Sequence, residues 1–70
     1  MKPEEFKHWR KSQGLTQQQA ASTIGISRRM VVNYEQGNTG GTNAKDVDIP
    51  LYIELACAAI AKGITHYSPE

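Results

Sequence analysis

Four closely spaced side chains, Arg28, Arg29, Val32 and Asn33, have the types and spacing needed to contact DNA bases. On a helix, residues one, four and five positions apart fall on one side, so these four would share a face. Arginine can donate two hydrogen bonds to guanine O6 and N7, asparagine can pair with adenine N6 and N7, and valine can contact a thymine methyl group. The alternative is a solvated polar face on a small helical bundle. The sequence of the neighbouring elements distinguishes these two readings.

Basic residues are concentrated in the central part of the chain, although the formal net charge of its 70 residues is only +1. The segment from Phe6 to Lys45 holds six basic residues and a single acidic one, Glu35. Basic side chains that neutralise phosphates release condensed counterions and thereby gain affinity. We therefore expect phosphates to be met along this segment.

The size and cysteine content of the chain argue against a catalytic or metal-binding protein. Seventy residues make one domain with a simple core. The lone Cys57 cannot form an internal disulfide, and no cysteines and histidines stand at metal-ligand spacing. The charged start, Met1–Glu5, suits neither a signal peptide nor a membrane anchor. We expect no enzyme activity, metal, cofactor, small-molecule ligand or membrane contact, and a cytoplasmic location.

Capping and turn signals predict three helices in the first half of the chain. The first spans about residues 3–13. A second begins after Thr16, an N-cap with a glutamine three residues on, and Gly25 can end it in a left-handed conformation. Ser27 can cap the third helix, about 28–36, only two residues later. The second and third helices are thus joined by a very tight turn.

The second half predicts a loop, one more helix and a tail. Residues 38–47 lack periodicity and are rich in turn formers, so we expect a surface loop. A helix over about 49–62 begins near Asp48, its expected cap, and is apolar almost all round, which predicts cover on more than one side. The tail, 63–70, is either a short extended segment or disordered. The fold class is all-α, a compact single domain over 1–70 of four or five helices.

The segment 17–36 carries small and apolar residues at the places where a steep helix crossing requires them. Ala21 supplies the small residue at the contact, Gly25 permits the turn, and Ile26 fills the space beneath it. The inward positions Val31 and Tyr34 leave the four side chains named first on the outer face. This turn pattern favours base contacts over a merely solvated face.

The gap-free segment Leu15–Gly37, LTQQQAASTIGISRRMVVNYEQG, resembles the phage repressor and Cro family of helix-turn-helix proteins, which have the lambda repressor-like fold. The opening glutamine, the small alanine, the turn glycine and the closing Tyr-Glu-x-Gly stand at the family's offsets. The resemblance implies binding to double-stranded DNA, with the helix 28–36 in the major groove and the preceding helix across the backbone.

The resemblance also implies roles for individual residues. It makes Arg28, Arg29 and Asn33 base readers, and Val32 accompanies them on the same predicted face. It makes Gln17 a phosphate contact, with Ser27 as a further one. Family members often pair an arginine of the first helix with a glutamate near the end of the third, and Arg10 and Glu35 stand at those places as a structural pair.

The chain departs from the family pattern after Gly37. The loop is longer, glycine-rich and poor in the lysines and arginines that often bind phosphates there. The remaining candidates for phosphate contacts in the loop are Asn38, Thr39 and Lys45, with Thr42 and Asn43 as further polar groups.

The apolar fourth helix predicts a two-fold dimer interface, because a monomer this small cannot cover both of its sides. The predicted interface residues are Tyr52, Ile53, Ala56, Cys57, Ile60, Ile64 and Tyr67. A two-fold dimer would set two recognition helices about one DNA turn apart, roughly 34 Å. The alternative is a compact four-helix core that absorbs these residues.

These features together predict a homodimeric transcription regulator of phage or bacterial type, a repressor that binds an inverted-repeat operator in a promoter, its own operon included. The alternative from another class is an antitoxin or accessory module that binds a different protein through the fourth helix. Only the recognition face of 28–33 argues for DNA.

Overall fold

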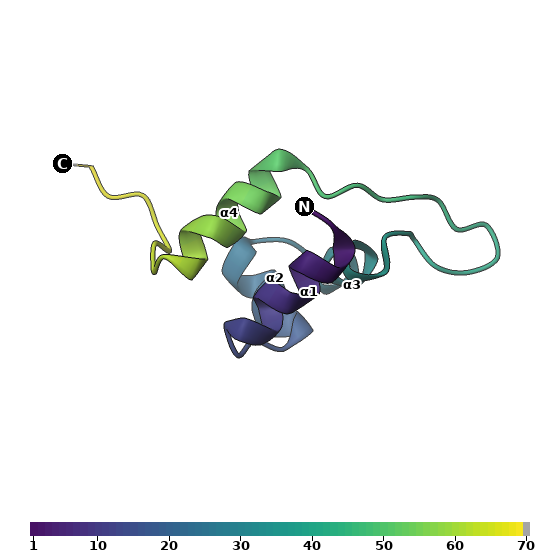
Figure 1. Ribbon diagram of the computed structural model, residues 1–70, viewed down its shortest axis with the longest axis horizontal. Helices are drawn as coiled ribbons and strands as arrows, with labels where there is room; N and C mark the ends of the chain where they lie inside the picture. Colours follow the sequence, from purple (N-terminus) through teal and green to yellow (C-terminus); the bar gives the residue numbers. More distant parts are fainter. Residues whose placement is uncertain (70) are drawn as a thin grey trace.

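The computed structural model describes residues 1–69 and consists of a helical body with one hairpin (Figure 1). The helices are α1 (Pro3–Ser12), α2 (Gln17–Ile24), α3 (Arg28–Gln36) and α4 (Leu51–Ala61). Helix α2 packs on α3, α1 packs on α3, and α4 closes the core through α1 and α2. The all-α prediction is confirmed. Glu70, the last residue of the predicted tail, lies outside the described residues.

Each helix contributes two side chains to the buried core. These are Phe6 and Trp9, Ala20 and Ala21, Val31 and Tyr34, and Ile53 and Cys57. The ring of Phe6 lies between those of Trp9 and Tyr34, at centroid distances of 5.5 and 5.6 Å. Tilted and edge-on aromatic contacts of this kind add stability beyond their buried area. The core therefore fixes α1 against α3.

The turn between α2 and α3 follows the predicted capping chemistry. The Thr16 hydroxyl accepts the amide of Gln19 at 3.1 Å, and the Gln19 side chain accepts the amide of Thr16 at 2.9 Å. Gly25 ends α2 with φ of 90°, a conformation that side chains other than glycine rarely adopt. Ser27 then caps α3 by accepting the amide of Met30 at 3.2 Å. Two helices can therefore cross within three residues of chain.

The fourth helix begins later than expected. Its N-cap is Pro50, in extended conformation with ψ of 155°, and the first helical residue is Leu51. The predicted cap, Asp48, is wrong because a proline ring clashes with the preceding residue in the helical conformation, which keeps Ile49 out of the helix. The helix therefore starts only after the proline.

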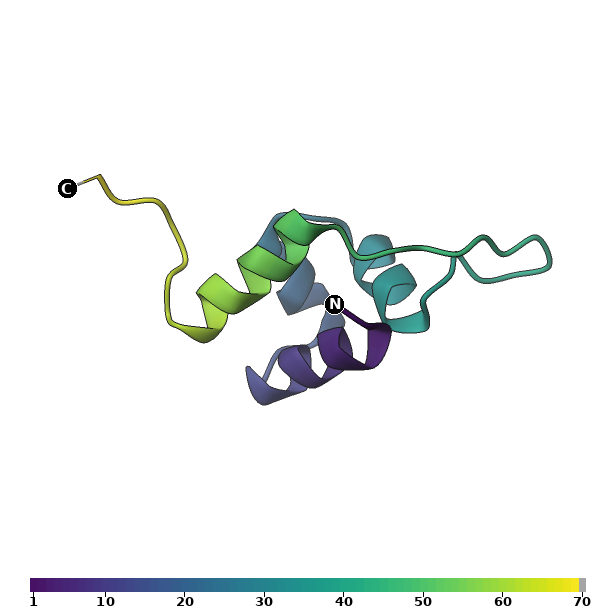
Figure 2. The same cartoon turned by 45° about the horizontal axis from the view of Figure 1, so that its top comes forward.

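The segment after α3 is a narrow antiparallel hairpin (residues 38–46) rather than an irregular loop. Asn38 and Asp46 form a β-bridge, the Thr39 amide donates to the Lys45 carbonyl at 2.9 Å, and the Thr39 hydroxyl accepts the Lys45 amide at 2.9 Å. The hairpin projects from the helical body at the end opposite the C-terminal tail (Figure 2). Its position at the end of α3 brings it to the same side of the body as that helix's C-terminus.

Helix α4 is covered on one side only, which corrects the expected interface. Ile53 and Cys57 are each 1% exposed and pack in the core, so they do not lie on a surface that a partner could reach. Leu51 and Leu55, which were not predicted to be exposed, are 68% and 59% exposed. An 11-residue helix against so small a body has room to bury only one of its faces.

We expect the Cys57 thiol to be unreactive in the folded protein. Burial, and secondarily the negative charge of Glu54, raise its pKa to about 11. At pH 8 the thiolate fraction, and hence the rate of reaction with Ellman's reagent, should be lower by on the order of 100-fold than in the urea-unfolded chain. Equal rates in the two states would show that the thiol is accessible.

Candidate nucleic-acid interface

The first turn of α3 is exposed, and Arg28 and Arg29 both lie on its surface. Val32, one turn later, is half-buried. The two guanidinium groups are therefore the prominent polar groups of the predicted reading face. An arginine in the first turn of a helix that enters the major groove is placed to reach base edges.

Asn33 does not lie on the exposed face predicted for it. It is only 8% exposed, and its Oδ1 is buried with no hydrogen-bond partner among the described residues. The residue immediately precedes the buried Tyr34, about 100° around the helix, and its short side chain does not extend past the border of the packed face. A buried acceptor without a partner costs about 1–3 kcal/mol of stability, so the buried Oδ1 of Asn33 destabilises the free protein.

The Arg10–Glu35 ion pair joins α1 to the C-terminal end of α3. Arg10 Nε donates to Glu35 Oε2 at 2.6 Å and Nη2 donates to Oε1 at 3.2 Å, and the two side chains are 12% and 6% exposed. Arg10 Nη1 also donates to the carbonyl of Leu15 at 2.9 Å, just before α2. One guanidinium group thus fixes the relative positions of three helices.

Gln17 connects this ion pair to Arg28, one of the two exposed arginines of α3. Its Nε2 donates to Glu35 Oε1 at 3.4 Å, and its Oε1 accepts Arg28 Nη2 at 3.3 Å. Sequence reasoning placed Gln17 and Arg28 separately and missed the bond between them, because residues 11 positions apart on different helices share no periodic signal. The orientation of Arg28 is therefore linked, through Gln17 and Glu35, to Arg10.

The remaining predicted phosphate contacts fall into two groups at opposite ends of α3. Ser27 is exposed at the start, and its hydroxyl accepts the Met30 amide while keeping its own hydrogen free to donate. Thr39 and Lys45 are exposed on the hairpin at the far end. The amide of Asn38 bonds within the hairpin region, to the Gln36 carbonyl at 3.2 Å and the Gly40 amide at 2.8 Å, so it shapes that segment.

A family model described as Helix-turn-helix matches residues 6–47, which is more than half of the chain. The chain belongs to the helix-turn-helix family of the Cro and C1 type. This helix-turn-helix protein is accordingly a DNA-binding transcription regulator whose partner is double-stranded DNA, in a family of regulators rather than enzymes. No curated protein and no solved structure matches the chain at a significant level.

Residues 1–69 contain neither a metal-binding cluster nor a membrane-spanning helix. No group of three or more histidine, cysteine, aspartate or glutamate side chains is arranged to hold a metal ion there. None of the helices in that range has the length and apolarity that a membrane crossing needs.

Replacing Arg10 by methionine should destabilise the helix-turn-helix protein strongly. Removing one partner of a buried ion pair leaves an uncompensated charge, here on Glu35, so we expect the free energy of unfolding to fall by about 3 kcal/mol. Lys11→Met, an exposed neighbour on α1, should change it by less than about 0.5 kcal/mol. Urea denaturation checks both variants. Equal stability of the two would contradict a structural role for the pair.

Proposed function

We propose that this helix-turn-helix protein is a homodimeric repressor that binds an inverted repeat in a promoter, of phage or bacterial type, in the bacterial or infected-cell cytoplasm. The observation that carries the proposal is the pair of exposed guanidinium groups at the start of α3, one of them held by Gln17. Repression needs no further contact, because a protein bound across a promoter excludes polymerase by occupying the site.

Base reading is assigned chiefly to Arg28 and Arg29, each able to donate two hydrogen bonds to a guanine. Val32 adds apolar contact with a thymine methyl group. Asn33 contributes only after its side chain rotates outward, which exchanges an unsatisfied buried oxygen for an adenine edge. The exposed arginines of the first turn would thus make the main base contacts, and the less exposed Val32 and Asn33 would add contacts further along α3.

Contacts to the DNA backbone are assigned to both ends of α3. Gln17 and Ser27 meet phosphates beside the reading turn, and Thr39 and Lys45 meet them from the hairpin. Asn38 is not assigned a phosphate contact, because its side chain bonds to the Gln36 carbonyl and the Gly40 amide and so stabilises the hairpin. Contacts of this kind set the register of the helix on the duplex, and they carry no base information of their own.

A second candidate function is favoured by one specific observation, the exposed apolar face of α4 with Leu51 and Leu55. Such a face would suit an antitoxin or accessory protein that holds a different protein there. A co-transcribed toxin gene would support this reading. An inverted repeat in the promoter of the protein's own operon would support the repressor.

Arg29→Ala should weaken binding to the preferred operator by about 1–3 kcal/mol and relax base preference at one position per half-site. Lys7→Ala, which removes an exposed positive charge from α1, is the matched control and should keep the preference unchanged. Fluorescence anisotropy with the operator and its single-base variants measures both effects. A uniform loss of affinity on all sequences would make Arg29 a phosphate contact instead.

The bond between Gln17 and Arg28 should appear as coupling in operator binding. In a double-mutant cycle, the cost of Arg28→Ala should be smaller in a Gln17→Ala background, with a coupling of at least about 0.5 kcal/mol, because Arg28 is no longer oriented. The same cycle with Gln18→Ala, an exposed neighbour, should show additive costs. Additivity in the Gln17 cycle would mean that the two residues act separately.

A further inference from the structure

The large exposed hydrophobic side chains of residues 1–69 all lie on α4 or in the tail that follows it. They are Leu51, Tyr52, Leu55, Ile64 and Tyr67, with exposed fractions between 58% and 87%. Single exposed hydrophobic residues are normal on a protein surface, whereas a contiguous group marks a contact with another molecule. The outward side of α4 is therefore the surface that most needs a partner.

The spacing on that side is the pattern of a helix-pairing seam. Leu51, Leu55, Ala58 and Lys62 follow one another at intervals of four, three and four residues and are all exposed. We call these four residues the outer face of α4. They lie opposite Ile53 and Cys57, which pack in the core. Alternating intervals of three and four keep a stripe facing one partner helix.

The charges that border the outer face favour an antiparallel partner of the same sequence. Glu54 stands in the first turn of α4, and Lys62 is its C-cap. Parallel pairing of two copies would place like charges side by side, whereas antiparallel pairing brings Lys62 of each copy to the first turn of the other, near Glu54. Glu54 is 47% exposed although it pairs with the Met1 amino group at 3.0 Å, so it remains accessible.

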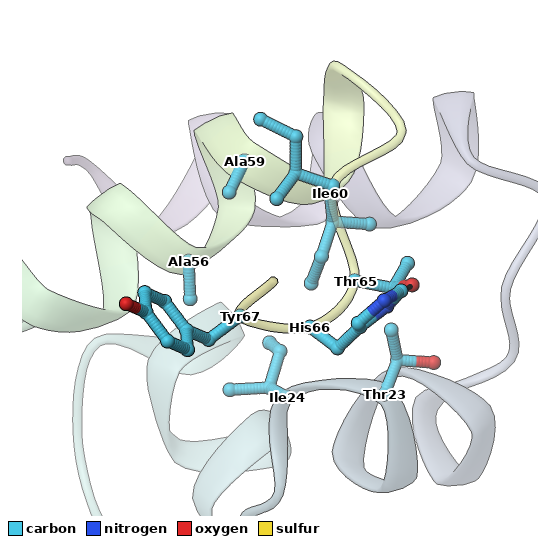
Figure 3. A pocket seen from close by; sticks show the side chains of 9 residues that line it. Thr23, Ile24, Ala56, Ala59, Ile60, Thr65, His66 and Tyr67 are labelled. Carbon is cyan, nitrogen blue, oxygen red and sulfur yellow. Dashed lines mark hydrogen bonds between the residues drawn. The ribbon is translucent and has the colours of Figure 1, made fainter. Parts of the chain in front are cut away.

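A shallow pocket of about 340 Å³ adjoins one flank of the outer face (Figure 3). Ala56, Ala59 and Ile60 line it from α4, Thr23 and Ile24 from α2, and the rest of its lining comes from the tail. When Leu55 of one copy meets Ala58 of the other in antiparallel register, Tyr52 of each copy lies level with Ala61 of the other, two residues along the helix from the pocket residue Ala59. The 68% exposed Tyr52 ring then reaches the rim of this apolar pocket.

We propose that the outer face of α4 pairs antiparallel with α4 of a second copy, Leu55 against Ala58, with Tyr52 at the pocket of the partner. The proposal deepens the proposed function and rests on it, because it identifies the surface through which two copies would meet on an inverted repeat. It replaces the buried Ile53 and Cys57 with Leu51, Leu55 and Ala58 as interface residues.

Sedimentation without DNA tests the pairing. Wild type should sediment as a dimer at tens of micromolar, and Leu55→Glu should raise the dimer dissociation constant at least about 100-fold, since two leucines lose their burial per dimer. Gln18→Glu adds the same charge at an exposed position on α2 and should leave the constant unchanged. A wild type that stays monomeric, or a Leu55→Glu variant that stays dimeric, overturns the proposal.

Charge exchange tests the direction and does not depend on Leu55→Glu remaining folded. Glu54→Lys or Lys62→Glu alone should weaken the dimer about fivefold, and the double exchange should restore it, because opposite charges then face each other again. Parallel pairing predicts no loss in the single variants, so unchanged single variants contradict the antiparallel arrangement.

Binding to a DNA fragment with one half-site separates the two proposals. Leu55→Glu should bind this fragment as well as wild type does, and lose affinity only on the full inverted repeat. If wild type fails to select any sequence while still dimerising, the proposed operator function fails and the pairing stands. If half-site binding is specific but no dimer forms at any concentration, only the pairing fails.

Discussion

The buried contact between Arg10 and Glu35 is the constraint on which the geometry of the reading helix depends. Charged groups are costly to remove from water, and they are tolerated only where each hydrogen bond finds its partner. Arg10 meets this requirement with two bonds to Glu35 and one to the Leu15 carbonyl, which ties α1, the start of α2 and the end of α3 together. Because Gln17 and Arg28 continue the same series of bonds, the exposed arginine is oriented from the core outward.

The parts of the molecule predictable from sequence are those determined by neighbours in the chain. Thr16, Gly25 and Ser27 act on groups within four residues, so their capping and turn roles follow from residue type alone. The buried position of Asn33 and the Gln17–Arg28 bond depend on how helices settle against one another, which no local pattern reports. The hairpin was missed because its cross-strand bonds form in a segment without strand periodicity.

The orientation of helix α4 is a further feature that local sequence patterns could not predict. Apart from Glu54 its sequence is apolar all round, so composition alone could not say which residues face the core and which face outward. The structure assigns Ile53 and Cys57 to the core and leaves Leu51 and Leu55 exposed. The isolated chain thus exposes two surfaces suited to binding, the cationic first turn of α3 and the apolar outer face of α4. DNA would bind the first surface, and a second copy of the chain would bind the second.

Selection of bound sequences from a random DNA pool tests most directly whether the first turn of α3 reads bases. We expect enrichment of an inverted repeat whose half-sites carry guanine opposite Arg28 and Arg29, with centres separated by about one helical turn, roughly 34 Å, or a multiple of it. A bound pool with no enriched sequence would contradict base reading by α3.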